Sequence, residues 1–149
     1  MTVAALVIGG CAAKRTTAVQ LVNDGRSPLG FAARHANRWL AVTGYIYSAG
    51  FQTGRKTSLE TSSHTTATHG VAVSWSKSEL KTRYVNYPLI RMGREGAILC
   101  FFPPRRVRAA ATYEARVGQY RRIVCRFRRF EDIGGRRFAV LSDCKSALR

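Results

Sequence analysis

Residues 118–148, GQYRRIVCRFRRFEDIGGRRFAVLSDCKSAL, combine two apolar runs with regularly spaced arginines. Successive side chains of a strand point to opposite faces, so Ile123, Cys125 and Phe127 share one face of the first run. The other face then carries Arg122, Val124, Arg126 and Arg128. Residues 131–135, EDIGG, supply a turn before the last strand, RRFAVLSDC. The segment predicts two antiparallel strands with one core face and one arginine-rich face, and a buried, unreactive Cys125.

Strand and helix patterns also occur nearer the N-terminus. Residues 38–51, RWLAVTGYIYSAGF, are rich in β-branched and aromatic side chains and largely alternate, which predicts a strand. Shorter strand runs follow at 71–75 and 82–90, and a buried-strand run, GAILCFF, occupies 96–102. Two prolines end that run and open a helix-favouring segment, 105–117. LGFAARHAN, 29–37, predicts a short N-terminal helix.

Residues 52–70, QTGRKTSLETSSHTTATHG, are almost all small or polar and have no apolar period. They predict a long polar loop. Loops longer than about 12 to 15 residues are uncommon in compact domains, so this one is either functional or disordered.

The element order places the helix between the third and fourth strands, as in the five-stranded OB-type barrel. We therefore expect a mainly β fold of that type, preceded by a short N-terminal helix. Periodicity alone also allows other small β-barrels.

The residues around these strands resemble the bacterial tRNA-anticodon-like OB family. NRWLAVTGYI resembles its opening strand, and AILCFF, the following helix and the segment that ends in VLSDC resemble its last three strands. The resemblance covers about residues 36–148, is poor over 51–90, and differs in the long insertion and the very basic fourth strand. It implies a single OB-like domain over 18–149. Many members are small secreted proteins or lipoproteins of the bacterial envelope.

The N-terminal segment, residues 1–17, allows two interpretations. MTVAALVIGGC contains a short apolar stretch followed by IGGC, which resembles a lipobox with Cys11 as the lipidated residue. Such a chain would be anchored to a membrane and face the bacterial periplasm. The stretch lacks a positively charged region before it and is short for a signal. The alternative is an ordered tail on a cytoplasmic or particle-associated protein.

Charge is the strongest compositional signal. The chain of 149 residues has 25 Lys and Arg against 8 Asp and Glu, a formal net charge of +17. Such an excess attracts polyanions, namely nucleic acid, anionic lipid or acidic proteins. The alternative is that the arginines reflect a compositional habit of the source organism.

Catalytic and metal-binding motifs are absent from the sequence. The four cysteines include no C-x-x-C pair, the histidines do not form H-E-x-x-H, and there is no phosphate-binding loop or G-x-S-x-G turn. We expect no metal, no cofactor and no enzymatic activity. In an OB topology the third and fifth strands are neighbours, so Cys100 and Cys144 either form a disulfide or remain two buried thiols.

The expected binding surface follows from the same topology, because OB folds bind on strands two and three and the flanking loops. Aromatic rings there would stack bases while arginines contact phosphates. The candidate residues for binding nucleic acid or another polyanion are Arg55, Lys56, Trp75, Tyr84, Tyr87, Arg122, Arg126, Arg128, Arg129, Arg136 and Arg137. A second aromatic platform, Trp39, Tyr45 and Tyr47, would adjoin the outward arginines of strand four, because the first and fourth strands pair in this fold.

Two functions remain open at this point. One is a module that binds single-stranded nucleic acid or another polyanion. The other is a structural protein of an envelope-anchored or particle-associated assembly, in which an exposed strand edge pairs with a partner protein.

Overall fold

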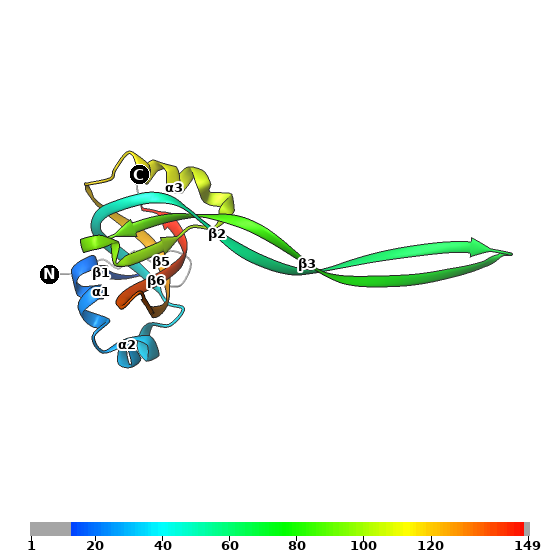
Figure 1. The fold of residues 1–149 in the computed structure, drawn as a ribbon, viewed down its shortest axis with the longest axis horizontal. Helices are drawn as coiled ribbons and strands as arrows, with labels where there is room; N and C mark the ends of the chain where they lie inside the picture. Colours follow the sequence, from blue (N-terminus) through cyan, green and yellow to red (C-terminus); the bar gives the residue numbers. More distant parts are fainter. Residues whose placement is uncertain (1–12, 148–149) are drawn as a thin grey trace. The chain divides into compact units, whose positions relative to one another are not determined.

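The computed structural model describes residues 13–147, without the side chains of Lys56 and Thr68 (Figure 1). Cys11 and most of the segment 1–17 lie outside the described residues. Within 13–147, no helix is both long and apolar enough to cross a membrane. The strands are β1 (Lys14–Thr17), β2 (Trp39–Thr68), β3 (Val71–Met92), β4 (Ile98–Phe101), β5 (Tyr120–Ile133) and β6 (Arg136–Ser146). The helices are α1 (Ala18–Asp24), α2 (Pro28–His35) and α3 (Val107–Glu114), with 3-10 turns η1 (Arg94–Gly96) and η2 (Pro104–Arg106).

Five of the strands form a ring in the order β2-β3-β4-β6-β5, which the pairing of β5 with β2 closes. The β4–β6 pair is parallel, and β2–β5, β3–β4 and β5–β6 are antiparallel. β1 adds in parallel to β2. The mainly β class and the helix between the third and fourth strands of the ring, α3, are confirmed. The short helix expected at 29–37 is confirmed as α2, and a second short helix, α1, precedes it.

The core lies inside the ring and contains the side chains that alternation predicted. Ile123, Cys125 and Phe127 have no exposed surface. Leu40 and Val42 face them from β2, and are equally buried. α2 contributes Phe31, whose ring lies 4.9 Å from that of Phe127 in an edge-on contact. The alternation of apolar and polar residues was sufficient here because one face of each strand is fully buried.

The helices are held against the ring by specific contacts. The Thr17 hydroxyl caps α1 by accepting a hydrogen bond from the Gln20 N–H at 3.1 Å. A Cβ added at Gly44 would lie 2.5 Å from the Ala18 Cβ, so glycine lets α1 approach β2 closely. On α3, the buried Tyr113 hydroxyl donates to the Arg122 carbonyl at 2.7 Å and accepts from the Ala147 N–H at 3.1 Å. These bonds connect α3 to β5 and to the end of β6.

The prediction of a long polar loop at 52–70 is wrong. Residues 52–68 continue β2, and the shorter strands expected at 71–75 and 82–90 belong to one strand, β3. The two strands are joined by His69 and Gly70, both with positive φ (52° and 75°), the backbone of a type I′ hairpin turn. The chain divides into two compact units, one formed by 1–52 and 87–149 and the other, which we call the ribbon, by 53–86.

Cross-strand side-chain pairs stabilise the ribbon instead of a core. Polar side chains form hydrogen bonds at every fourth residue along one face. The Thr53 hydroxyl donates to the Asn86 amide oxygen at 2.8 Å, and hydroxyl groups lie 3.2 to 3.3 Å apart in the pairs Thr57–Thr82, Thr61–Ser78 and Thr65–Ser74. The other face carries ion pairs of Glu60 with Lys81 and Arg83. Among the described side chains of 53–86, none is buried. Because neither face is buried, the sequence has no apolar period and resembles a loop.

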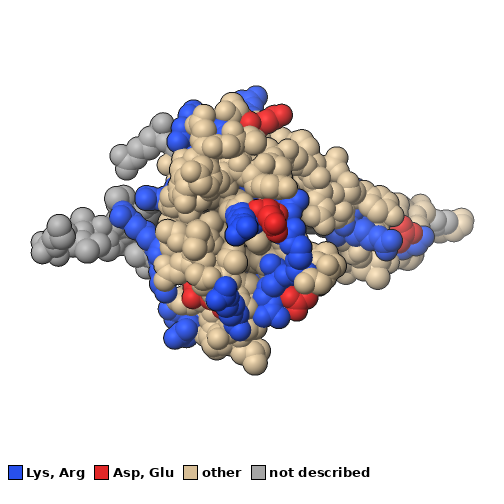
Figure 2. Space-filling view, turned by 60° about the vertical axis from the view of Figure 1, so that its left-hand side comes forward, with Lys and Arg blue, Asp and Glu red and all other residues tan. Residues whose placement is uncertain are grey.

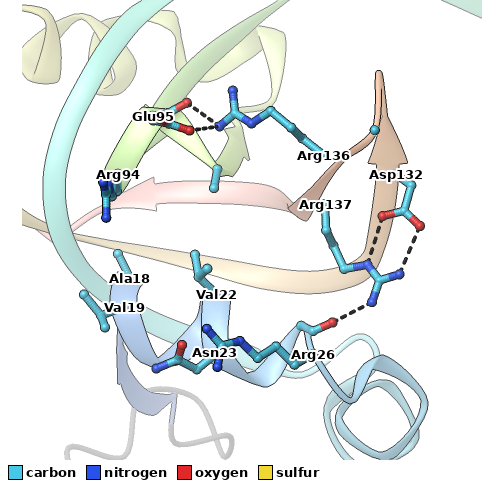
Figure 3. A pocket seen from close by; sticks show the side chains of 13 residues that line it. Ala18, Val19, Val22, Asn23, Arg26, Arg94, Glu95, Asp132, Arg136 and Arg137 are labelled. Carbon is cyan, nitrogen blue, oxygen red and sulfur yellow. Dashed lines mark hydrogen bonds and ion pairs between the residues drawn. The ribbon is translucent and has the colours of Figure 1, made fainter.

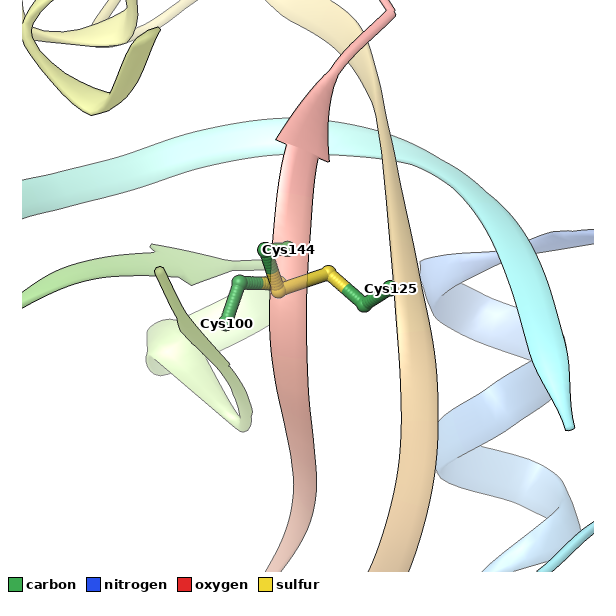
Figure 4. Close-up of side chains that lie close together, drawn as sticks. All are labelled: Cys100, Cys125 and Cys144. Carbon is green, nitrogen blue, oxygen red and sulfur yellow. A yellow bond between two sulfur atoms is a disulfide. The ribbon is translucent and has the colours of Figure 1, made fainter. Parts of the chain in front are cut away.

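Neither alternative for Cys100 and Cys144, a disulfide or two buried thiols, is correct, and Cys125 is buried as expected but is not a thiol. Cys144 is bonded to Cys125, with an S–S distance of 2.07 Å. Cys100 is a buried free thiol that lies 3.7 Å from the Met92 sulfur, and burial raises the pKa of this thiol well above its usual value. β6 lies between β4 and β5, so Cys144 has a cysteine on each neighbouring strand. All three sulfur atoms lie within 4.8 Å of one another, as the converging side chains in Figure 4 show.

Candidate nucleic-acid interface

The outer face of the β2–β5 pair brings aromatic rings and arginines together. In the antiparallel register, Trp39 lies opposite Arg126, Thr43 opposite Arg122, and Tyr45 opposite Tyr120. Leu40, Val42, Ile123 and Cys125 alternate with these residues and are buried in the core, so the six paired side chains point outward. We call this set, with Lys145 of the adjacent β6, the aromatic–arginine face. The expectation that the first aromatic strand and the outward arginines of strand four are neighbours is confirmed.

The ring of Trp39 contacts two cations of this face. The Arg126 guanidinium carbon lies 4.9 Å and the Lys145 ammonium nitrogen 4.5 Å from the centre of its rings. Both distances are within the range of a cation–π interaction. The Arg126 Nε is buried and has no hydrogen-bond partner among the described residues. Within residues 13–147, neither Arg126 nor Lys145 forms an ion pair, so the indole contacts two cations that no described carboxylate neutralises.

The tyrosines and Arg122 extend the face along the strands. The Tyr45 and Tyr120 rings meet edge to face, with centres 4.1 Å apart, and remain 55% and 48% exposed. The Arg122 Nε donates to the Thr43 hydroxyl at 3.3 Å, which orients the guanidinium but leaves it exposed. Along the face, Ala41 and Val124 separate the half-buried pair Trp39 and Arg126 from the exposed Arg122 and the two tyrosines.

The two strand segments that form the aromatic–arginine face carry no carboxylate. Neither 39–47 nor 120–126 contains an acidic residue. Six of the acidic side chains form ion pairs outside these segments, namely Glu60, Glu79, Glu95, Glu131, Asp132 and Asp143. Figure 2 shows one face of the molecule, on which Lys and Arg are more widespread than Asp and Glu. The unneutralised charge of the aromatic–arginine face thus follows from where the few carboxylates lie.

A second cationic group lies beside the start of β2. The Lys14 ammonium nitrogen lies 3.3 Å from the His35 ring nitrogen Nε2. Burial, and then the charges of Lys14, Arg34 and Arg38, lower the pKa of His35 below its usual value. Arg38 directly precedes Trp39, so this positive potential adjoins the aromatic–arginine face.

The structure separates the candidate residues inferred from the sequence. Arg122 and Arg126 belong to the aromatic–arginine face. Tyr87 is half-buried on β3. The side chain of Lys56 is not described. Three others belong to the ribbon, namely Arg55, Trp75 and Tyr84. There the Arg55 guanidinium lies 5.9 Å from the centre of the Tyr84 ring, and the Trp75 ring lies beside that of His64.

The remaining four candidates are engaged in internal contacts. Arg128 donates to Asn37, Ser142 and Asp143. The other three form ion pairs: Arg129 with Glu131, Arg136 with Glu95, and Arg137 with Asp132. The pairing of β5 with β6 shifts between Phe127 and Arg129, which makes Arg128 the extra residue of a β-bulge, opposite no residue of β6.

Several residues of the site were missed from the sequence. Tyr120 and Lys145 lie at strand ends, where too few residues remain for an alternating apolar–polar pattern to show which face a side chain is on. The RHANR run, residues 34–38, signalled a local concentration of positive charge. Tyr47 was expected with Trp39 and Tyr45, but its ring lies 5.2 Å from the Arg91 guanidinium of β3.

In comparisons with known proteins, no protein-family model, no curated protein and no solved structure matches this chain.

Proposed function

We propose that the protein is a non-enzymatic module that binds single-stranded nucleic acid along the aromatic–arginine face. The contact of Trp39 with both Arg126 and Lys145 carries the proposal. An aromatic surface flanked by unneutralised cations suits a chain that alternates flat bases with phosphates. The strand order β2-β3-β4-β6-β5, with α3 before β5, supports an OB-type barrel of the kind the sequence resembles.

Each part of the face has a separate task in this proposal. The exposed rings of Tyr45 and Tyr120 stack on bases, which is tolerant of sequence because every base has a π-face. Arg122, Arg126 and Lys145 contact phosphates and release counterions. We therefore expect weak sequence preference and a steep loss of affinity with salt.

Replacing Tyr120 with Ala tests the stacking role directly. We expect the affinity for a fluorescein-labelled single-stranded oligonucleotide, measured by anisotropy, to fall by about 1 to 3 kcal/mol, the usual loss of one stacked base. Tyr84→Ala on the ribbon is the matched control, because it removes another exposed tyrosine ring, and it should bind as the unmodified protein does. Equal losses in the two variants, or no loss for Tyr120→Ala, would exclude Tyr120 from the site.

The ribbon favours a second candidate function, a structural role in an assembly. An isolated two-stranded hairpin is marginally stable in water, and no described side chain of 53–86 is buried. Its outer strand edges offer backbone groups for strand addition by a partner protein. In an envelope assembly, a lipidated Cys11 would be the membrane anchor.

Hydrogen exchange distinguishes the two functions. If the protein acts in an assembly, the amides of residues 57–82 exchange rapidly in the free chain and become protected in the complex isolated from the native source. If it binds nucleic acid, an added oligonucleotide protects residues 39–45 and 120–126 and leaves the ribbon unchanged. Unprotected ribbon amides in the native complex would argue against strand addition.

A further inference from the structure

A pocket lies beside α1, away from the residues of the aromatic–arginine face. Its volume is about 830 Å³, within the range of small-molecule sites. Its walls come from α1, from the turn between β3 and β4, and from the turn between β5 and β6. Figure 3 shows the side chains that line it, all within the unit formed by 1–52 and 87–149.

Two arginines of the pocket are fixed by carboxylates. Arg137 forms a two-pronged contact with Asp132 at 2.9 and 3.0 Å, and also donates to the Gly25 carbonyl at 2.7 Å. Arg136 pairs with Glu95 at 3.2 Å and donates to the carbonyl of the same residue. The hydrogen bond from Arg137 lowers the pKa of Asp132, so this carboxylate stays ionised and paired. Both carboxylates are therefore neutralised by the pocket's own arginines.

Two further arginines leave the pocket with excess positive charge. Arg26 and Arg94 are exposed, and neither has an ion-pair or side-chain hydrogen-bond partner within the described part of the chain. The lining thus contains four arginines and two acidic residues. The lining therefore offers an anionic ligand two guanidinium groups that no described carboxylate occupies.

One wall of the pocket is apolar. It consists of Ala18, Val19 and Val22 of α1, and Ala97 faces the pocket from the β3–β4 side. Val19 is 65% and Val22 42% exposed. A ligand with a hydrocarbon body would remove these side chains from water, whereas inorganic phosphate would leave them exposed.

We propose that this pocket binds a small amphipathic organic anion, in which a sulfonate, phosphate or carboxylate group is joined to an apolar body. The anionic group lies between Arg26 and Arg94, and the apolar body lies against Val19 and Val22. This site is independent of nucleic-acid binding, because it shares no residue with the aromatic–arginine face.

A titration with 8-anilinonaphthalene-1-sulfonate tests the proposal on the full chain. We expect saturable binding at one site, and changes in amide chemical shift confined to residues 18–26, 94–97 and 134–137. The neutral analogue N-phenyl-1-naphthylamine and inorganic phosphate each lack one half of the ligand, so both should bind at least about tenfold more weakly.

The double variant Arg26→Gln/Arg94→Gln should weaken sulfonate binding about tenfold or more. Arg105→Gln/Arg108→Gln is the matched control, because it removes the same charge from arginines outside the pocket and should leave binding unchanged. All four side chains are exposed, so both variants should fold, which circular dichroism checks.

Equal binding by the two double variants, equal binding of the neutral analogue, or shift changes outside these segments would overturn the proposal. Oligonucleotide affinity should be the same in the two double variants, so failure of this site and failure of the nucleic-acid proposal are separate results.

Discussion

The triple variant Arg122→Gln/Arg126→Gln/Lys145→Gln is expected to bind single-stranded DNA about 10- to 100-fold more weakly at about 0.15 M salt. In the proposed complex, each cation of the face would neutralise one phosphate and release condensed counterions. The slope of log affinity against log salt concentration should become shallower by about 2, since each single-strand phosphate contact contributes about 0.7. Anisotropy titrations over a series of salt concentrations measure both quantities.

A control variant that loses the same charge at another surface distinguishes binding at the aromatic–arginine face from general electrostatic attraction to the protein. Arg105, Arg106 and Arg108 lie on η2 and α3 and have no ion-pair partner within residues 13–147, so their replacement by glutamine is the control. We expect the control to keep most of the affinity and the slope. Equal losses in the two triple variants would mean that net charge alone attracts the nucleic acid.

Arg128 is left out of this test because of its contacts. Sequence alternation groups it with Arg122 and Arg126, but its guanidinium donates to Asn37 and Asp143 at 2.6 Å each. Replacing it would leave those groups without their partner and change the structure near β6. A loss of binding in such a variant would not report on phosphate contacts.

The sequence predicted the paired parts of β2 and β5 because these segments have one buried face. In 119–130 the buried face requires apolar residues at alternate positions, and Ile123, Cys125 and Phe127 follow that rule. The neighbouring positions of β2 and β5 then followed from the topology, which placed Trp39 beside the outward arginines. This part of the candidate site was therefore predictable.

The ribbon could not be predicted from apolar alternation, because neither of its faces is buried. The signals present were the repeated Thr and Ser residues, whose β-branched or hydroxyl side chains pair across the strands, and the His69–Gly70 turn. These features are also typical of loops. Likewise, the ion pairs of Arg129, Arg136 and Arg137 depend on bulges and turn geometry that periodicity does not encode.

The cysteine cluster gives the largest expected effect on stability. Cys144→Ala removes the disulfide, which joins residues 19 apart in sequence, and should lower the free energy of unfolding by about 3 kcal/mol. The constraint on the unfolded chain is lost, and Cys100 and Cys125 remain as buried thiols on strands that are not adjacent in the ring. Urea denaturation without reductant measures the change. Cys100→Ala is the control, since it keeps the disulfide and removes only one small buried side chain.

Cys125→Ala should behave differently from Cys144→Ala, although both remove the same bond. The three sulfur atoms lie equally within 4.8 Å of one another, but only Cys144 has Cys100 on an adjacent strand, the parallel neighbour β4, so oxidation can join these two. We therefore expect Cys125→Ala to form a Cys100–Cys144 disulfide, visible by peptide mapping, and to lose less stability than Cys144→Ala. Two free thiols in oxidised Cys125→Ala, with a loss of stability equal to that of Cys144→Ala, would show that the core admits only the Cys125–Cys144 bond.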